Sequence, residues 1–332
     1  MDIRVIVGKG EVKGESYRLE STADAEDDQP ETREGEVAAA LHGERLDKVI
    51  VTLAPEFSRS HLQALIKGGQ VSVDAKPAGS VAQRVRAGQR IAMTLLPTEE
   101  SRAYRAEAMP LAVVFEDDEL LVVDKAAGRV VHPAAGNWSG TLLNGLLERY
   151  PASASLPRAG IVHRLDKDTS GLMVVGKTLV AVTALVRAIA GREVSRRYLA
   201  IAQGKAPAVP FSIEAPIGRD PQMRLRMAVV ASGKPARTDI ERLATDDVFS
   251  ALRCTLHTGR THQIRVHLAS RGWPLVGDRL YGGRPALGIE RQALHAAELA
   301  FAHPLSGRPL AFASALPADL APAWRQLTGS AD

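Results

Sequence analysis

The chain has 332 residues, 45% of them hydrophobic, and is long enough to form two folded units that each bury a core. Its one cysteine, Cys254, excludes an internal disulfide and a cysteine-clustered zinc site. No apolar stretch approaches the roughly 20 residues of a membrane-spanning helix, and the start of the chain lacks the apolar region of a signal peptide. We therefore expect a cytoplasmic protein with no membrane partner.

Charge is distributed unevenly along the chain. Residues 1–36 contain 5 Lys or Arg against 11 Asp or Glu, a net of −6, and because the whole chain carries +4, about +10 is left for the remainder. A basic surface attracts phosphates without choosing a sequence, so nucleic acid is the leading partner class. The acidic stretch from Glu20 to Glu36 lacks the apolar periodicity of a packed face. We expect residues 1–42 to be an acidic, disordered extension.

Residues 43–97 have the pattern of a small basic unit. Apolar residues recur at helical spacing from Leu46 to Leu53, and Ser58 is placed to cap a second helix that ends at Gly68 and Gly69. A short strand is expected at 71–74. The basic residues are spaced as a rim rather than as a core, and they include Lys67, Arg84, Arg86 and Arg90.

Residues 98–110 are expected to be a linker, and residues 111–328 a larger domain. Strands are predicted at 111–115, 120–124, 171–175, 198–202, 226–230 and 251–256, and helices at 142–150, 179–190 and 262–269. Such interleaving of many strands with a few helices predicts the α+β class, with a mixed, mainly antiparallel sheet and flanking helices.

The run from Ile161 to Gly171 holds the most informative carboxylate, Asp166, which lies between basic side chains just before an apolar stretch. An acid held there can react with, or orient, an anionic polymer. Asp168 follows two residues later and lies on the same side if the segment is extended, so the residues alone do not choose between the two acids.

A second block, from Gly259 to Leu268, could supply a partner for that acid. A half-buried carboxylate needs one, because its ionised form is otherwise costly. Thr261 is placed to cap a helix beginning near His262, and this helix would carry Arg265 on a rigid element. On spacing alone, a surface arginine that contacts a phosphate is the simpler interpretation of Arg265.

Together the two blocks resemble the motifs of the pseudouridine synthases that modify ribosomal RNA. The match runs residue by residue through His163, Arg164, Leu165 and Asp166, and on through 169–171. The resemblance extends from about Gly43 to the C-terminal region. Residues 43–47 and 58–60 resemble the S4 RNA-binding domain, and the chain is most similar to the S4-bearing D type that modifies large-subunit RNA.

The resemblance implies isomerisation of specific uridines to pseudouridine in large-subunit (23S) ribosomal RNA, in the stem-loop at the interface of the ribosomal subunits. It makes Asp166 the catalytic carboxylate, Arg265 its ion-pair partner and Tyr198 the aromatic residue beside a flipped-out base. From the residues alone, Tyr198 is more simply a core tyrosine of a strand. The reaction needs no metal and no small-molecule cofactor, because one carboxylate can start it.

RNA binding is expected from His163, Arg164, Arg260 and Ile264 in the larger domain and from Arg45, Arg59 and Lys67 in the S4-like unit. The expected partner is large-subunit ribosomal RNA or a pre-ribosomal particle, bound by a monomer. The segment Gly277–Gly283, which includes Asp278, is expected to be scaffold or an RNA-contacting loop.

Three other functions remain open. The chain could act on transfer RNA or on other ribosomal uridines, or it could be a ribosome-assembly factor that binds RNA without catalysis. Asp166 and Asp168 could form the carboxylate pair of a glycoside hydrolase, although acids two residues apart are poorly placed across a sugar ring. His257, His262 and His267 do not converge in a helix or a strand, so we expect no metal site.

Overall fold

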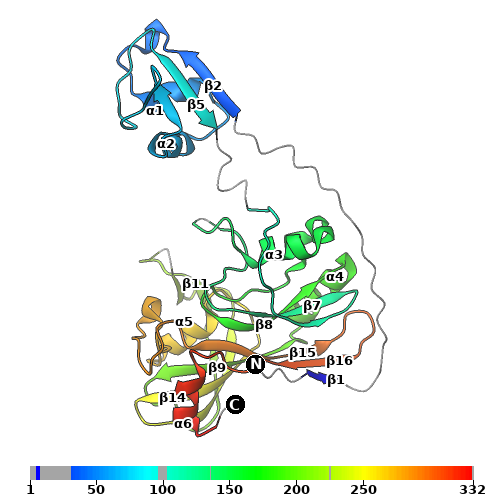
Figure 1. Ribbon diagram of the computed structural model, residues 1–332. Helices are drawn as coiled ribbons and strands as arrows, with labels where there is room; N and C mark the ends of the chain where they lie inside the picture. The colour runs from blue at the N-terminus through cyan, green and yellow to red at the C-terminus, as the bar shows by residue number, and fades with distance from the viewer. Residues whose placement is uncertain (1–4, 8–30, 96–102, 135, 224–225, 331–332) are drawn as a thin grey trace. The chain divides into compact units, whose positions relative to one another are not determined.

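The computed structural model describes residues 5–7, 31–95, 103–134, 136–223 and 226–330. The chain divides into two compact units, one of residues Lys13–Arg102 and the other of Met1–Val12 with Ala103–Asp332 (Figure 1). No helix in these described ranges is long and apolar enough to cross a membrane.

In its described residues, the smaller unit is an antiparallel sheet in the order β2-β5-β3-β4 with two α-helices. Ser58 caps the second helix by accepting a hydrogen bond from His61 N at 3.3 Å, as its position predicts. Leu46, Ile50 and Leu62 are fully buried, so the apolar spacing forms a core of this unit's own. Its elements are β2 (Glu31–Glu36), α1 (Leu46–Val49), α2 (Arg59–Lys67), β3 (Val71–Val73), β4 (Lys76–Pro77) and β5 (Arg90–Leu95).

The expectation of a disordered extension over 1–42 is wrong for its described part. Strand β2 pairs with β5 over its whole length, and a short strand, β1 (Val5–Val7), pairs with β16 of the larger unit. In β2 the outward side chains are polar or acidic, and the inward positions are Arg33 and Gly35. Arg33 donates a hydrogen bond to Leu53 O at 3.1 Å. Backbone pairing therefore forms this strand without the apolar alternation that the prediction required. Residues 8–30 lie outside the described residues.

The larger unit is built on one mixed sheet that has ten strands in the described part of the chain. Its main path runs β10-β13-β14-β9-β15-β8-β7-β6, with β16 paired to β15 and β1 paired to β16. Among the described pairs only β8 with β15 is parallel, which confirms the predicted fold class. Strands β11 and β12 form a separate ribbon. The strands are β6 (Val113–Glu116), β7 (Leu120–Lys125), β8 (Ser170–Gly176), β9 (Ser195–Gln203), β10 (Phe211–Glu214), β11 (Ile217–Arg219), β12 (Met227–Val229), β13 (Arg237–Thr245), β14 (Phe249–Leu256), β15 (Leu294–Ala302) and β16 (Pro309–Ala313).

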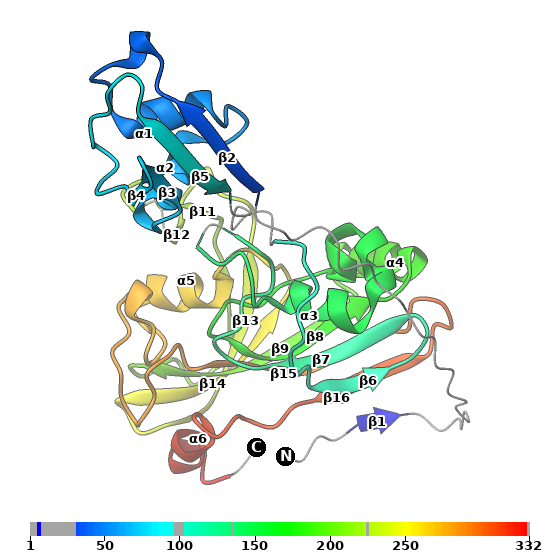
Figure 2. The ribbon, with the colours of Figure 1, turned by 45° about the horizontal axis from the view of Figure 1, so that its top comes forward.

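Helices cover both faces of this sheet. They are α3 (Leu142–Arg149), α4 (Leu179–Ala190), α5 (Gln263–Ser270) and α6 (Ala321–Thr328). Alternate residues of β7 point to opposite sides, because Leu121 packs with α3 while Leu120 packs with Leu185 of α4. Helix α5 lies on the α3 side, and α6 lies beneath β14 on the other side (Figure 2).

The boundary between the two units, between Arg102 and Ala103, falls within the linker expected over 98–110. From residue 103 onward this segment packs on the larger unit, where Asn144 Nδ2 of α3 donates to Arg105 O at 2.8 Å and Gly140 N donates to Glu107 Oε2 at 2.7 Å. Residues 98–102 lie outside the described residues. Thr261 does not cap α5, because His262 occupies the N-cap position with a left-handed φ of +56° and no side chain caps the helix.

Candidate active site

Asp166 lies on the loop that leads into β8. Its carbonyl oxygen accepts a hydrogen bond from Thr169 N at 3.1 Å, which closes the loop just before the strand. Gly171 then pairs with Ala296 of β15, and a Cβ atom at Gly171 would lie 2.3 Å from the Ala296 carbonyl oxygen. Only glycine permits this approach, with a φ of +114°. The close contact of the two parallel strands therefore positions the loop.

Lys125, the last residue of β7, supports the same loop. Its Nζ donates to the carbonyl oxygens of Ala126 (3.0 Å), Arg129 (2.9 Å) and Lys167 (3.0 Å). Burial lowers the pKa of Lys125 to about 7, and nearby aspartate charges work against that fall. The three carbonyl oxygens match the three donors of an ammonium group, so this lysine links the loop to the sheet.

Arg265, from α5, binds Asp166 across 99 residues of sequence. Arg265 Nη1 donates to Asp166 Oδ2 at 3.0 Å, and the two side chains are only 8% and 12% exposed. Arg265 Nε and Nη2 donate to the two carboxylate oxygens of Asp278 at 2.7 and 2.9 Å. The expected pairing of Arg265 with Asp166 is thus present. Asp278, expected only as scaffold, belongs to the same buried charge cluster and holds the guanidinium in place.

Tyr281 lies against Arg265, and His262 lies between Tyr281 and Asp166. Arg265 Cζ lies 5.0 Å from the centre of the Tyr281 ring, within the range of a cation–π contact. The Tyr281 hydroxyl and His262 Nδ1 share a hydrogen bond of 2.8 Å, and His262 Nε2 lies 3.9 Å from Asp166 Oδ1. Burial lowers the pKa of His262, so its ring is neutral near pH 7 and adds no charge beside the carboxylate.

Asp166, Tyr198 and Arg265, the three residues expected to be catalytic, line one cleft of about 520 Å³, a volume that includes its open mouth. Tyr198 comes from β9 and is 5% exposed, and burial raises the pKa of its phenol to about 12. Arg196 also lines the cleft, although no sequence motif singled it out. Its position two residues before Tyr198 on a strand is the signal that could have found it, since such residues share a face.

The residues of the larger unit that were expected to bind RNA also line this cleft, namely His163, Arg164, Arg260 and Ile264. Arg164 is exposed. Arg260 is half-buried, and its Nε donates a hydrogen bond to Pro235 O at 3.1 Å. His163 Nε2 accepts a hydrogen bond from Val174 N at 3.0 Å, and burial lowers the pKa of this imidazole to about 3. His163 is therefore neutral and ties the loop that carries Asp166 to β8.

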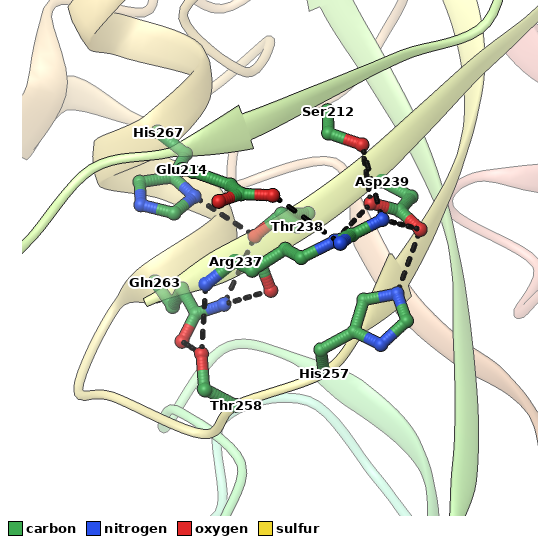
Figure 3. A network of polar contacts seen from close by, with 9 residues as sticks. All are labelled: Ser212, Glu214, Arg237, Thr238, Asp239, His257, Thr258, Gln263 and His267. Atoms are coloured by element: carbon green, nitrogen blue, oxygen red, sulfur yellow. Dashed lines mark hydrogen bonds and ion pairs between the residues drawn. The ribbon is translucent and has the colours of Figure 1, made fainter. Parts of the chain in front are cut away.

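Gln263, the first residue of α5, fastens the preceding loop to β13 (Figure 3). Its Nε2 donates to Arg237 O at 2.9 Å and to Thr238 Oγ1 at 3.0 Å. Its Oε1 accepts from Thr258 Oγ1 at 2.7 Å and from Arg260 N at 3.0 Å. Every donor and acceptor of the buried amide is used. This positioning role depends on contacts between distant segments, so no local pattern in the sequence indicates it.

The three basic residues expected to bind RNA in the smaller unit are placed differently from one another. Arg45 and Arg59 donate to the fully buried carboxylate of Asp47, at 3.0 and 2.8 Å, and remain 41% and 47% exposed. The hydrogen bond from Arg45, together with those from Gln63 and Arg59, outweighs burial and holds the pKa of Asp47 well below its usual range. Lys67, at the end of α2, is exposed.

No group of three or more His, Cys, Asp or Glu side chains among the described residues is arranged to hold a metal ion.

Comparisons with known proteins agree with this geometry. The family model of the RNA pseudouridylate synthases matches residues 119–270, and the S4 domain matches residues 44–91. The ribosomal large subunit pseudouridine synthase D of Nitrosomonas europaea is 45% identical over 324 residues, which cover 95% of this chain and 94% of that protein. The enzyme of the same description from Neisseria meningitidis serogroup B is 49% identical and covers 86% of this chain and 79% of its own length.

Among solved structures, that of the human RNA pseudouridylate synthase domain containing 1 superimposes on this chain with a TM-score of 0.51 at 27% identity. The match covers 67% of this chain and 86% of the human one. The match to the Nitrosomonas enzyme spans nearly the whole of both chains. The chain therefore belongs to the RNA pseudouridylate synthase family.

Proposed function

We propose that this enzyme isomerises specific uridines of large-subunit (23S) ribosomal RNA, with Asp166 as the catalytic carboxylate acting on a flipped-out base. The observation that carries the proposal is the 3.0 Å ion pair between Asp166 and Arg265 inside a cleft that Tyr198 also lines. Asp278 secures Arg265 from behind, so the pair is held before any substrate arrives.

The chemistry requires a carboxylate but no oxidant or reductant. The bond between the sugar carbon C1′ and the uracil nitrogen N1 breaks, the base turns, and C1′ joins the ring carbon C5. Asp166 acts where positive charge or a new bond develops, and Arg265 compensates the buried charge of that carboxylate. The glycosidic bond is inaccessible inside a paired helix, so the base must leave the stack. The ring of Tyr198 offers it an aromatic surface in the cleft.

The relatives named for the large ribosomal subunit and the S4 match at residues 44–91 support ribosomal RNA as the substrate. We infer that the target lies in the stem-loop at the subunit interface, and that the enzyme acts in the cytoplasm as a monomer on free RNA or a pre-ribosomal particle. In the smaller unit, Arg45, Arg59 and Lys67 then contact phosphates, because the first two keep exposed edges while bound to Asp47. In the larger unit, Arg164 and Arg260 do so at the cleft.

The test uses 23S RNA tritiated at uridine C5, because replacing the C5 hydrogen by the sugar releases tritium. The wild-type enzyme should release it, whereas Asp166→Asn should bind the RNA and release none. Asp168→Asn is the matched control and should keep the wild-type rate, since Asp168 does not line the cleft.

Three results would contradict the proposal. Equal release by wild type and Asp166→Asn would remove Asp166 from the mechanism. Release from transfer RNA but not from 23S RNA would favour the other substrate class. Binding without release by the wild type would favour an assembly factor that has no catalysis.

A further inference from the structure

Arg196 is a buried arginine that lines the cleft without a partner. It is 5% exposed, and its Nε atom is fully buried with nothing to accept its hydrogen bond. Across the described parts of the chain, no hydrogen bond or ion pair engages its guanidinium. Three nearby arginines differ: Arg265 is bound by two carboxylates, Arg197 pairs with Glu298 at 3.0 Å, and Arg164 is exposed to water.

The geometry of β9 directs Arg196 into the cleft. Arg196 and Tyr198 are buried on the same face of the strand, while Arg197 between them is exposed. Gly259 leaves room for the guanidinium, since a Cβ atom there would lie 3.1 Å from Arg196 Nη1. Burial raises the pKa of Tyr198, and the positive charge of Arg196 opposes that rise. Arg196 therefore lies beside the aromatic ring that the base would meet.

A lone buried guanidinium is costly for the free protein, because arginine does not lose its proton and cannot become neutral. A group that enters the cleft and carries negative charge would remove that cost. RNA offers two such groups, the backbone phosphates and the uracil base. A phosphate stays at the surface of the nucleic acid, whereas the deep position of Arg196 is accessible to an extruded base, so the observations favour the base.

Uracil becomes negatively charged during the reaction. When the C1′–N1 bond breaks, its electron pair leaves with N1 and is delocalised onto the carbonyl oxygens O2 and O4. If a carboxylate instead adds to ring carbon C6, the electron pair of the C5–C6 double bond moves toward O4. Both routes therefore place charge on a carbonyl oxygen, and a donor aimed at it binds the transition state more strongly than the neutral substrate.

We propose that Arg196 is a further catalytic residue, whose guanidinium donates hydrogen bonds to a carbonyl oxygen of the target uracil and stabilises the negative charge on the ring. This inference rests on the proposed function. The step is balanced, because the ring's electron pair forms the C5–C1′ bond, the C5 proton leaves to solvent and N1 takes up a proton. Arg196 keeps all its protons, and nothing is oxidised or reduced.

The test compares Arg196→Met with Arg197→Met, which removes the exposed neighbour on the same strand. For each variant, the single-turnover rate on 23S RNA, the Kd for that RNA and the thermal midpoint are measured. Arg196→Met should keep or raise the midpoint, because it removes an unpaired buried charge, and should leave Kd unchanged. Its rate should fall about 10²- to 10³-fold, as for loss of one oxyanion-stabilising donor. Arg197→Met should keep the wild-type rate.

A substrate comparison separates catalysis from a structural role. The second RNA carries 5-fluorouridine at the target position, where fluorine withdraws electrons and stabilises the charged ring. The rate at which the target nucleotide is consumed should therefore fall less from wild type to Arg196→Met on this RNA than on RNA with uridine. An equal deficit on both RNAs together with a lower midpoint would make Arg196 structural. A weaker Kd with a salt slope reduced by about 1 would assign it to a phosphate. An unchanged rate would also overturn the inference, and failure of the wild type on both RNAs would instead refute the proposed function.

Discussion

Asp278 is the residue whose replacement should affect the charge cluster most. It accepts two of the three hydrogen bonds that Arg265 donates, at 2.7 and 2.9 Å, and its side chain is 1% exposed. Asp278→Asn keeps the shape of the side chain but removes its charge and turns one acceptor oxygen into a donor. One N–H of the buried guanidinium of Arg265 then faces another donor instead of an acceptor.

Removing one partner of a buried ion pair costs about 3–5 kcal/mol, because the other charge remains buried. Each hydrogen bond to a charged group contributes about 1.5–3 kcal/mol, so the loss of one and the weakening of the other, which keeps only a neutral acceptor, give a similar figure. For a unit of this size, 1 kcal/mol shifts the thermal midpoint by roughly 2–4 °C. Asp278→Asn should therefore lower the midpoint of the larger unit by roughly 6–20 °C, and the rate should fall because Arg265 is no longer fixed against Asp166.

Calorimetry of the full chain measures this shift, and Asp319→Asn is the matched control. Asp319 also receives two hydrogen bonds from one arginine, Arg291, at 2.6 and 3.1 Å, but its side chain is 47% exposed. Arg291 itself is 14% exposed, but it keeps other acceptors such as Asp168 O at 2.8 Å when the half-exposed carboxylate is replaced. A pair open to water on one side contributes about 0–1 kcal/mol, so the control should shift the midpoint by no more than about 4 °C. If the two variants shifted it equally, the reasoning from burial would be wrong.

Two further predictions concern Tyr198 and Lys67. Burial raises the pKa of Tyr198 from 10.0 to about 12, so its phenol stays protonated below pH 10. The preference of the folded protein for the neutral phenol therefore adds fully to the free energy of unfolding below pH 10, and this contribution is lost between pH 10 and 12. Tyr198→Phe should therefore leave the shape of the pH–rate profile below pH 10 unchanged. If the wild-type rate changed with pH on the alkaline side below pH 10 and the variant's rate did not, this prediction would be wrong. Lys67→Ala should weaken RNA binding alike for every sequence and lower the slope of log K against log salt by about 1, and an unchanged slope would exclude a phosphate contact.

Local patterns predicted the helices better than the strands. The prediction for 179–190 matches α4, and α3 ends one residue before the expected boundary, because apolar spacing and the capping residues Thr178 and Thr141 mark these helices locally. Strand β15, with the sequence Leu-His-Ala-Ala-Glu-Leu-Ala-Phe-Ala, was missed since it is rich in residues that favour helices. Its place between β9 and β8 is decided by pairing with distant segments.

The same limit applies to the site. Spacing alone favoured a surface position for Arg265, yet the structure buries it to 8% exposure between two carboxylates. Asp278 was assigned to a scaffold loop, because nothing in its neighbourhood reveals that the loop returns to α5. A physical argument could have pointed to it, since an arginine buried on a helix has five donors and one carboxylate satisfies only two of them.

The two buried arginines belong to groups of opposite formal charge. Asp166 and Asp278 with Arg265 carry a formal net charge of −1, and Arg196 on β9 carries +1. Breaking the bond between C1′ and N1 separates charge in the same sense, because the sugar becomes positive and the base negative. A base that stacks on Tyr198 beside Arg196, with its sugar toward Asp166, would place each developing charge next to its opposite. Because these groups are fixed by β9, α5 and the β8–β15 contact, little reorganisation is needed when the charges appear.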